Sequence, residues 1–103
     1  MATAALLAQQ LRADDAAARS AAAETLASMG ETAAGAAAEL VACCDDPAVG
    51  GDCVAALEAL GPPPVDQLPA IARLLASLSG EVAYWAATLL GRVGETAAPH
   101  ADA

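Results

Sequence analysis

The chain has 103 residues, a length that allows one compact domain. It carries thirteen carboxylates against four arginines and no lysine, which gives a formal net charge of −9. Because phosphate binding relies on Lys and Arg, this charge argues against nucleic-acid partners and against an anionic membrane surface. No signal-like segment opens the chain and no apolar run approaches the ~18 residues of a membrane-spanning helix, so we expect a soluble, cytoplasmic protein.

The sequence repeats itself with a period of 31 to 33 residues. Residues Gly30–Ala34 recur unchanged as Gly94–Ala98, and Gly61 closes a third phrase between them. A period of this length is typical of helical solenoids, in which each helix pair buries its apolar face against its neighbours. We therefore predict an all-α protein with helix pairs at about 3–30, 34–61 and 66–94, and a partial fourth unit at 95–103.

The first helix of each pair is expected at residues 3–13, 34–44 and 67–78. Thr3, Thr32 and Asp66 are the candidate N-caps, because a side-chain oxygen can accept a backbone N–H from the first turn. Between the second and third pairs, Pro62–Pro64 cannot continue a helix and favour an extended connection.

The second helix of each pair is expected to begin after an N-cap, namely Asp15, Asp46 and Ser79, and to end at a glycine, namely Gly30, Gly61 and Gly94. Within each helix, apolar residues recur at i, i+4, i+8 and i+11, which is typical of a buried face. The three apolar stripes are Ala18, Ala22, Leu26 and Met29; Val49, Cys53, Leu57 and Leu60; and Val82, Ala86, Leu90 and Val93. Since 32 of the residues are alanine, the predicted core is thin.

The segment Leu11–Arg19 followed by Ala21–Leu26 and a closing Gly30 resembles the HEAT repeat, in the short version also seen in the HEAT-like repeats of bilin lyases. The second repeat has Gly50 where the family usually has arginine, and the third has Ala83. Only Arg19 keeps that arginine. The resemblance implies a right-handed α-solenoid of about three HEAT-like helix pairs, with the second helices lining its concave face.

The cysteines and the single histidine do not form a recognisable metal or catalytic site. Cys53 occupies a stripe position and is expected to be buried. Adjacent Cys43 and Cys44 end a first helix, where a place near the core is favoured over an exposed pair open to oxidation or soft metals. His100 lies in the terminal stub, so neither four zinc ligands nor an activated nucleophile can be assembled. We expect no metal, no cofactor and no enzyme activity.

Two aromatic residues mark the surface that departs from the repeat. Tyr84 and Trp85 stand side by side, near Thr88, on the second helix of the third pair. Tyr84 is expected to be exposed, because an aromatic ring with a polar tip is a common interface anchor. For Trp85 two alternatives stay open: an interface residue, or a core residue that fills a gap left by alanines.

Paired carboxylates recur at the loop between the helices of the first two pairs. Asp14 and Asp15 align with Asp45 and Asp46, so the four are expected along one ridge. Such a ridge would attract a basic protein partner; alternatively, it only keeps an alanine-rich surface solvated.

We therefore predict a non-enzymatic protein-binding or scaffold module that uses the second-helix face. One alternative, implied by the resemblance, is an accessory subunit or fragment of a larger enzyme assembly, such as a tetrapyrrole lyase. Another is a self-assembling piece, because the third pair is rich in bulky aliphatic residues that a homodimer through the third repeats would cover. These residues are Ile71, Leu74, Leu75, Leu78, Leu89 and Leu90.

Overall fold

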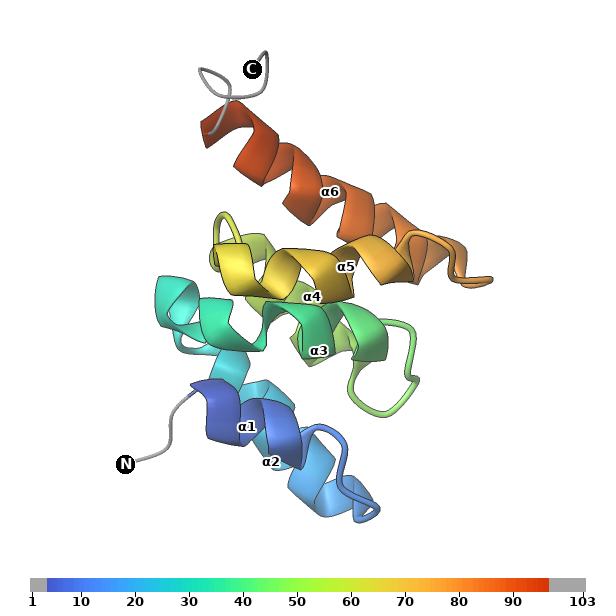
Figure 1. The fold of residues 1–103 in the computed structure, drawn as a ribbon. Helices are drawn as coiled ribbons and strands as arrows, with labels where there is room; N and C mark the ends of the chain where they lie inside the picture. Colours follow the sequence, from blue (N-terminus) through green and yellow to red (C-terminus); the bar gives the residue numbers. More distant parts are fainter. Residues whose placement is uncertain (1–3, 97–103) are drawn as a thin grey trace.

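The computed structural model describes residues 4–96, with side chains described to residue 93, and this part of the chain is all-helical (Figure 1). Its α-helices are α1 (Ala4–Gln10), α2 (Ala16–Ala27), α3 (Ala37–Cys43), α4 (Gly50–Ala59), α5 (Leu68–Leu74) and α6 (Gly80–Thr96). Two 3-10 helices, η1 (Gly30–Ala36) and η2 (Val65–Gln67), precede α3 and α5. The prediction of an all-α protein is confirmed for these residues.

The chain reverses direction between α1 and α2, between α3 and α4, and between α5 and α6, and the three connecting loops lie along one edge of the molecule (Figure 1). α1 packs on η1, α3 packs on α5, and α2 packs extensively on α4. The last helix departs from this order, because α6 lies mainly on α5 and α3 rather than on α4.

The predicted starts of the second helices are largely correct. The Asp15 carboxylate accepts the Ala17 N–H at 3.0 Å, and the Ser79 hydroxyl accepts the Val82 N–H at 3.3 Å. Asp46 accepts the Ala48 N–H at 2.8 Å, but it caps a turn that precedes α4 rather than α4 itself. Short polar side chains therefore set these helix starts, as expected from their capping chemistry.

Two of the three predicted glycine stops are correct. Gly30 and Gly61 have φ angles of +59° and +75°, in the left-handed region that ends a helix without steric cost for glycine. The prediction for Gly94 is wrong, because α6 continues through it to Thr96. Glycine permits a helix end but does not impose one. The rest of the expected fourth unit, residues 97–103, lies outside the described residues.

The predicted caps of the first helices are wrong where the structure describes them. Thr32 lies inside η1 and its hydroxyl donates to the Met29 carbonyl at 2.6 Å. Asp66 lies inside η2, and α5 has Gln67 at its cap position with no side-chain bond to the first turn. Both helices are entered through a turn of 3-10 helix, so no single cap residue begins them. Thr3 lies outside the described residues.

Gln67 instead connects the second and third pairs. Its side-chain amide donates to the Gly35 carbonyl at 2.8 Å and accepts the Ala38 N–H at 3.0 Å. These two backbone groups flank the junction of η1 and α3, where the expected single helix at 34–44 is divided. The Gln67 side chain therefore bonds to two backbone groups near the break between η1 and α3, where a continuous helix would have bonded them itself.

The buried core runs through all three pairs. The apolar stripe predicted for the third pair is wrong in part. In α4 and its ends, Val49, Cys53, Leu57 and Leu60 are all buried as predicted. In the first stripe, Ala22 and Leu26 are buried and Ala18 and Met29 are half-buried. In α6 the buried face is instead formed by Val82, Trp85, Ala86 and Leu89, while Leu90 and Val93 are half-buried. The face is rotated because α6 packs across α5 and α3.

Candidate partner-binding site

One stripe of α6 faces α4 and carries large side chains. Glu81, Trp85, Thr88 and Arg92 follow the i, i+4, i+7, i+11 spacing of one helix face. At its carboxyl end, the Arg92 guanidinium donates to the Leu57 carbonyl at 2.7 Å and to the Gly61 carbonyl at 3.1 Å. Arg92 thus satisfies backbone acceptors at the end of α4 and ties the two helices together there.

The Trp85 ring packs against the Arg92 guanidinium. The guanidinium carbon of Arg92 lies 5.8 Å from the centre of the Trp85 ring, within the range of a cation–π interaction. Trp85 itself is only 8% exposed. Of the two alternatives for this residue, the structure shows the core residue, so Trp85 offers almost no surface to a partner.

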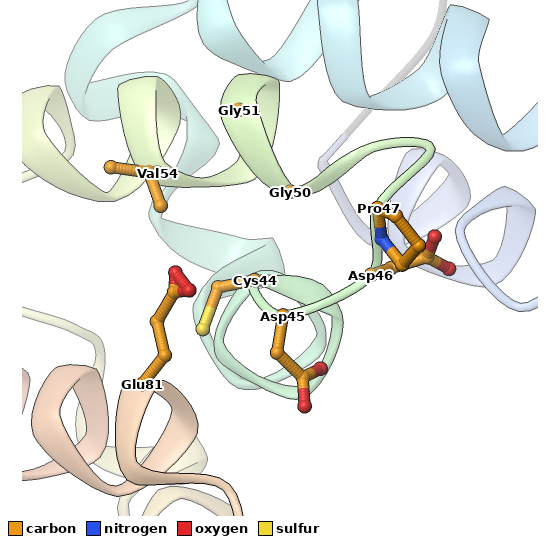
Figure 2. Close-up of a pocket in the computed structure, with 8 residues that line it drawn as sticks. All are labelled: Cys44, Asp45, Asp46, Pro47, Gly50, Gly51, Val54 and Glu81. Carbon is orange, nitrogen blue, oxygen red and sulfur yellow. The ribbon is translucent and has the colours of Figure 1, made fainter.

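Toward the amino ends of α4 and α6 the two helices separate around an open cleft of about 400 Å³ (Figure 2). The Cys44 side chain points into it from the end of α3, and Glu81 reaches it from the first turn of α6, whereas the Asp45 carboxylate points away from Glu81 (Figure 2). The complete lining is Cys44, Asp45, Asp46, Pro47, Gly50, Gly51, Val54 and Glu81.

Small facing side chains allow α2 to lie close to α4. The buried residues of α2 and α4 are mostly small, including Ala22, Ala23, Gly50 and Cys53. Small residues allow two helix axes to approach closely, whereas bulky ones at the contact keep them apart. On α6, Arg92 reaches the carboxyl end of α4, where it donates to the Leu57 and Gly61 carbonyls.

The floor of the cleft is set by a close backbone approach at Gly50. A Cβ atom at this position would lie 2.6 Å from the Cys44 carbonyl oxygen, so only glycine fits. In the first pair the aligned residue is Arg19, which donates to the Ala13 and Asp14 carbonyls at 2.8 and 3.2 Å. The same loop is thus held by a guanidinium in one pair and by direct backbone packing in the next.

The cleft is electronegative. Its lining contains three carboxylates and, within the described part of the chain, no arginine. Burial, followed by the charges of Glu81 and Asp45, raises the pKa of the Cys44 thiol to about 11. The Cys44 thiol is therefore protonated at neutral pH. Because the thiolate is the reactive form, we expect Cys44 to react slowly.

The other thiols are protected in the same way. Cys53 is fully buried, as predicted, and burial raises its pKa to about 12. Cys43 is half-buried, and burial followed by the charge of Glu39 raises its pKa. Within residues 4–93, no group of three or more His, Cys, Asp or Glu side chains is placed to hold a metal ion. His100 lies outside the described residues.

Tyr84 lies on the exposed side of α6. Tyr84 is 62% exposed, as expected, and its ring meets that of Trp85 edge to face at 5.5 Å. Thr88 is half-buried and its hydroxyl donates to the Tyr84 carbonyl at 2.8 Å, so it is bonded within its own helix. An exposed aromatic ring therefore rests on a buried one beside Glu81.

The four ridge aspartates do not act as one group. The loops that carry them do share an edge of the molecule (Figure 1), but only Asp45 and Asp46 line the cleft. Asp14 and Asp15 are exposed on the first loop, and Asp15 is engaged as a cap. Glu81, Cys44 and Val54 line the cleft but were not predicted from the sequence, although Glu81 stands four positions before Trp85 and thus on the same helix face.

Comparisons with models of known protein families, with curated proteins and with solved structures find no match to this chain. The resemblance to HEAT repeats accordingly stays a prediction from the sequence pattern. Among the helices that the structure describes, none is long and apolar enough to cross a membrane.

Proposed function

We propose that this protein is a non-enzymatic protein-binding module, a short HEAT-like solenoid that binds its partner on α6 beside the α4–α6 cleft. The observation that carries the proposal is the exposed Tyr84, whose ring packs on the buried Trp85 ring. Glu81, three residues earlier on the same helix, lines the cleft. The solenoid part is supported by the succession of helix pairs, by their loops along one edge and by the two left-handed glycines.

Tyr84 is suited to partner binding because its ring is held before a partner arrives. Tyrosine has few rotatable bonds, so it provides a large contact area at low cost in conformational entropy. The edge-to-face contact with Trp85, at an interplanar angle of 84°, further restricts the ring. Affinity is gained when the ordering of a contact residue is completed in the free protein.

The test is capture of partners from an extract of the native cell by the immobilised full chain. We expect Tyr84→Ala to reduce recovery of a specific partner by about tenfold or more, the effect of losing an interface hot spot. Val65→Ala is the matched control, because Val65 is also a large exposed residue of the third pair, at 78% exposure. It lies before the amino end of α5, whereas Tyr84 lies on α6, which follows the carboxyl end of α5. Equal recovery by wild type, Tyr84→Ala and Val65→Ala would contradict the proposal.

The homodimer through the third repeats stays a prediction, with a smaller surface than expected from the sequence. Ile71 and Leu89 are buried within the chain, and Leu74 and Leu90 are half-buried. Leu75 and Leu78 remain, at 46% and 105% exposure. A stable interface buries roughly 800 Å² on each partner, which two leucines do not provide alone. Light scattering over a hundredfold concentration range distinguishes a monomer from a dimer.

A further inference from the structure

We propose that the exposed face of α6 binds a second copy of this chain, with the two α6 helices antiparallel and crossing near Ala87. This face is formed by Tyr84, Ala87 and Gly91, which follow the spacing of one side of a helix and are all exposed. The inference goes beyond the proposed function, with which it shares only Tyr84. It also moves the predicted dimer contact from the leucines of the third pair to α6.

The exposed face of α6 lies at the end of the stack of helices. α6 packs on α5 and α3, and Figure 1 shows it at the opposite end of the described chain from α1 and α2. Its buried side is formed by Val82, Trp85, Ala86 and Leu89. At 3.6 residues per turn, Tyr84, Ala87 and Gly91 lie on the opposite side of the helix, where another helix can pack.

This face lacks the charges that the aligned helices carry. The exposed Glu24 of α2 aligns with Thr88, and the exposed Glu58 of α4 aligns with Gly91. Residues 82–91 contain no charged side chain. Because charged residues are depleted at the centre of protein interfaces, an exposed helix face without charges indicates a surface that is buried in a complex.

The distribution of charge restricts where two copies of the chain can meet. Residues 4–61 contain nine carboxylates and two arginines, whereas residues 62–93 contain two carboxylates and two arginines. Two copies that met through the first two pairs would bring like charges together, which disfavours the contact. A contact through α6 keeps these acidic parts away from each other. A basic partner, by contrast, would be attracted to the first two pairs.

The residues of this face are complementary to one another in shape when two α6 helices run antiparallel. Nothing lies within 4 Å of a Cβ added at Gly91, so packing within the chain does not require glycine there. Glycine weakens a helix, but it allows a neighbouring helix to approach closely. Tyr84 lies about two turns before Gly91 on the same side. In a two-fold symmetric pair, the Tyr84 ring of each copy therefore covers Gly91 of the other, and Ala87 meets Ala87 on the axis.

The size of the contact predicts a weak dimer. α6 has 17 residues and is therefore about 25 Å long. One helix face of this length provides less than the roughly 800 Å² per partner that a stable complex buries. We therefore expect a dissociation constant of about 10–100 μM.

Sedimentation equilibrium of the full-length protein measures this association, at concentrations from about 1 μM to about 1 mM and at low and high salt. Two variants, Ala87→Glu and Gly91→Glu, each place a carboxylate in the contact, and the space around Gly91 accepts a side chain without a clash inside the chain. Ala21→Glu is the matched control, because Ala21 is exposed on α2 and the substitution changes the net charge equally. Circular dichroism of each variant checks that the helices are retained.

We expect a monomer–dimer equilibrium. Ala87→Glu and Gly91→Glu should each weaken the dimer by about tenfold or more, and Ala21→Glu by less than about twofold, because only the first two place like charges at the contact. Higher salt should strengthen the dimer, since it screens the repulsion between the acidic parts of the two copies.

Four results would overturn the inference: a monomer at the highest concentration, equal effects of Ala87→Glu and Ala21→Glu, a dimer that salt weakens, or a mass that grows beyond two copies, since a two-fold contact closes at the dimer. The proposed function is judged separately, by partner capture with Tyr84→Ala. A monomeric protein whose capture of another protein depends on Tyr84 would overturn this inference and leave the proposed function standing.

Discussion

The two interfaces of α4 differ in how closely the neighbouring helix approaches. On one side α2 lies along α4 and buries small residues such as Ala22 and Ala23. On the other side α6 touches α4 chiefly through Arg92, and a cleft remains between their amino ends. The closed interface contributes to the core, whereas the open one leaves carboxylates and an aromatic ring accessible. The surface on which the proposed function rests therefore lies where the spacing of the helices departs from the repeat.

Removal of the Trp85 side chain is expected to cause the largest loss of stability. Trp85→Ala should destabilise the protein by about 3–5 kcal/mol, the cost of truncating a large buried aromatic residue. Arg92 would lose the aromatic ring over which its guanidinium lies. Urea unfolding followed by circular dichroism measures the change, with Trp85→Phe as the milder variant that keeps the fold. A loss below about 1 kcal/mol, typical of surface positions, would show that Trp85 is not part of the core.

Arg92 tests the closed end of the same interface. Arg92→Gln should cost about 1.5–3 kcal/mol, because a charged donor leaves the Leu57 and Gly61 carbonyls. Arg73→Gln is the control, since Arg73 is exposed at the end of α5 and a surface change there is expected within about 0.5 kcal/mol. Equal unfolding midpoints for the two variants would contradict the bridging role of Arg92.

Two adjacent glycines, Gly50 and Gly51, test how closely α4 packs on the loop that precedes it. Gly50→Ala should destabilise by about 1–3 kcal/mol, as overpacking does, because its Cβ would meet the Cys44 carbonyl at 2.6 Å. Gly51→Ala should stabilise by up to about 1 kcal/mol, because alanine favours the helix and nothing lies within 4 Å of the added Cβ. The opposite signs are read from thermal unfolding. Two changes of the same sign would mean that α4 is not seated on the preceding loop as described.

The cysteines give the smallest effect, and it depends on pH. Their folded pKa values are raised, to about 11 for Cys44 and about 12 for Cys53, because burial disfavours the thiolate. Their contribution is therefore constant at neutral pH, and stability falls as pH rises from about 9 toward these values. Cys53→Ala should reduce that decline. Alanine is the residue at the aligned positions of the other two repeats, Ala22 and Ala86, so we expect it to fit at position 53. Stability that increases between pH 9 and 11 would have the wrong sign.

Thiol labelling checks the same burial at neutral pH. Cys43 should react first because it is half-buried, whereas Cys44 and Cys53 should react only when the protein unfolds. Rapid labelling of Cys53 in the native protein would mean that its helix face is not the buried one.

The sequence predicts local features better than the placement of α6. Asp15, Ser79, Gly30 and Gly61 act as predicted because capping and left-handed turns depend on the residue itself. The cleft could not be predicted in this way, since it depends on where α6 packs relative to α4. The periodic pattern assigned Leu90 and Val93 to the core, but the tilt of α6 buries Trp85 and Leu89 instead. The departure at Gly50 was visible in the sequence, but the contact that requires glycine was not.

The most direct test of the account is nuclear magnetic resonance of the isotope-labelled full-length protein titrated with a partner recovered in the capture experiment. If the open α4–α6 interface is the binding site, the largest amide shifts will fall on Glu81, Tyr84, Gly51 and Val54, with little change along α2. Shifts spread evenly over the acidic surface, or concentrated at Asp14 and Asp15, would contradict the claim that the gap between α4 and α6 is where this protein binds.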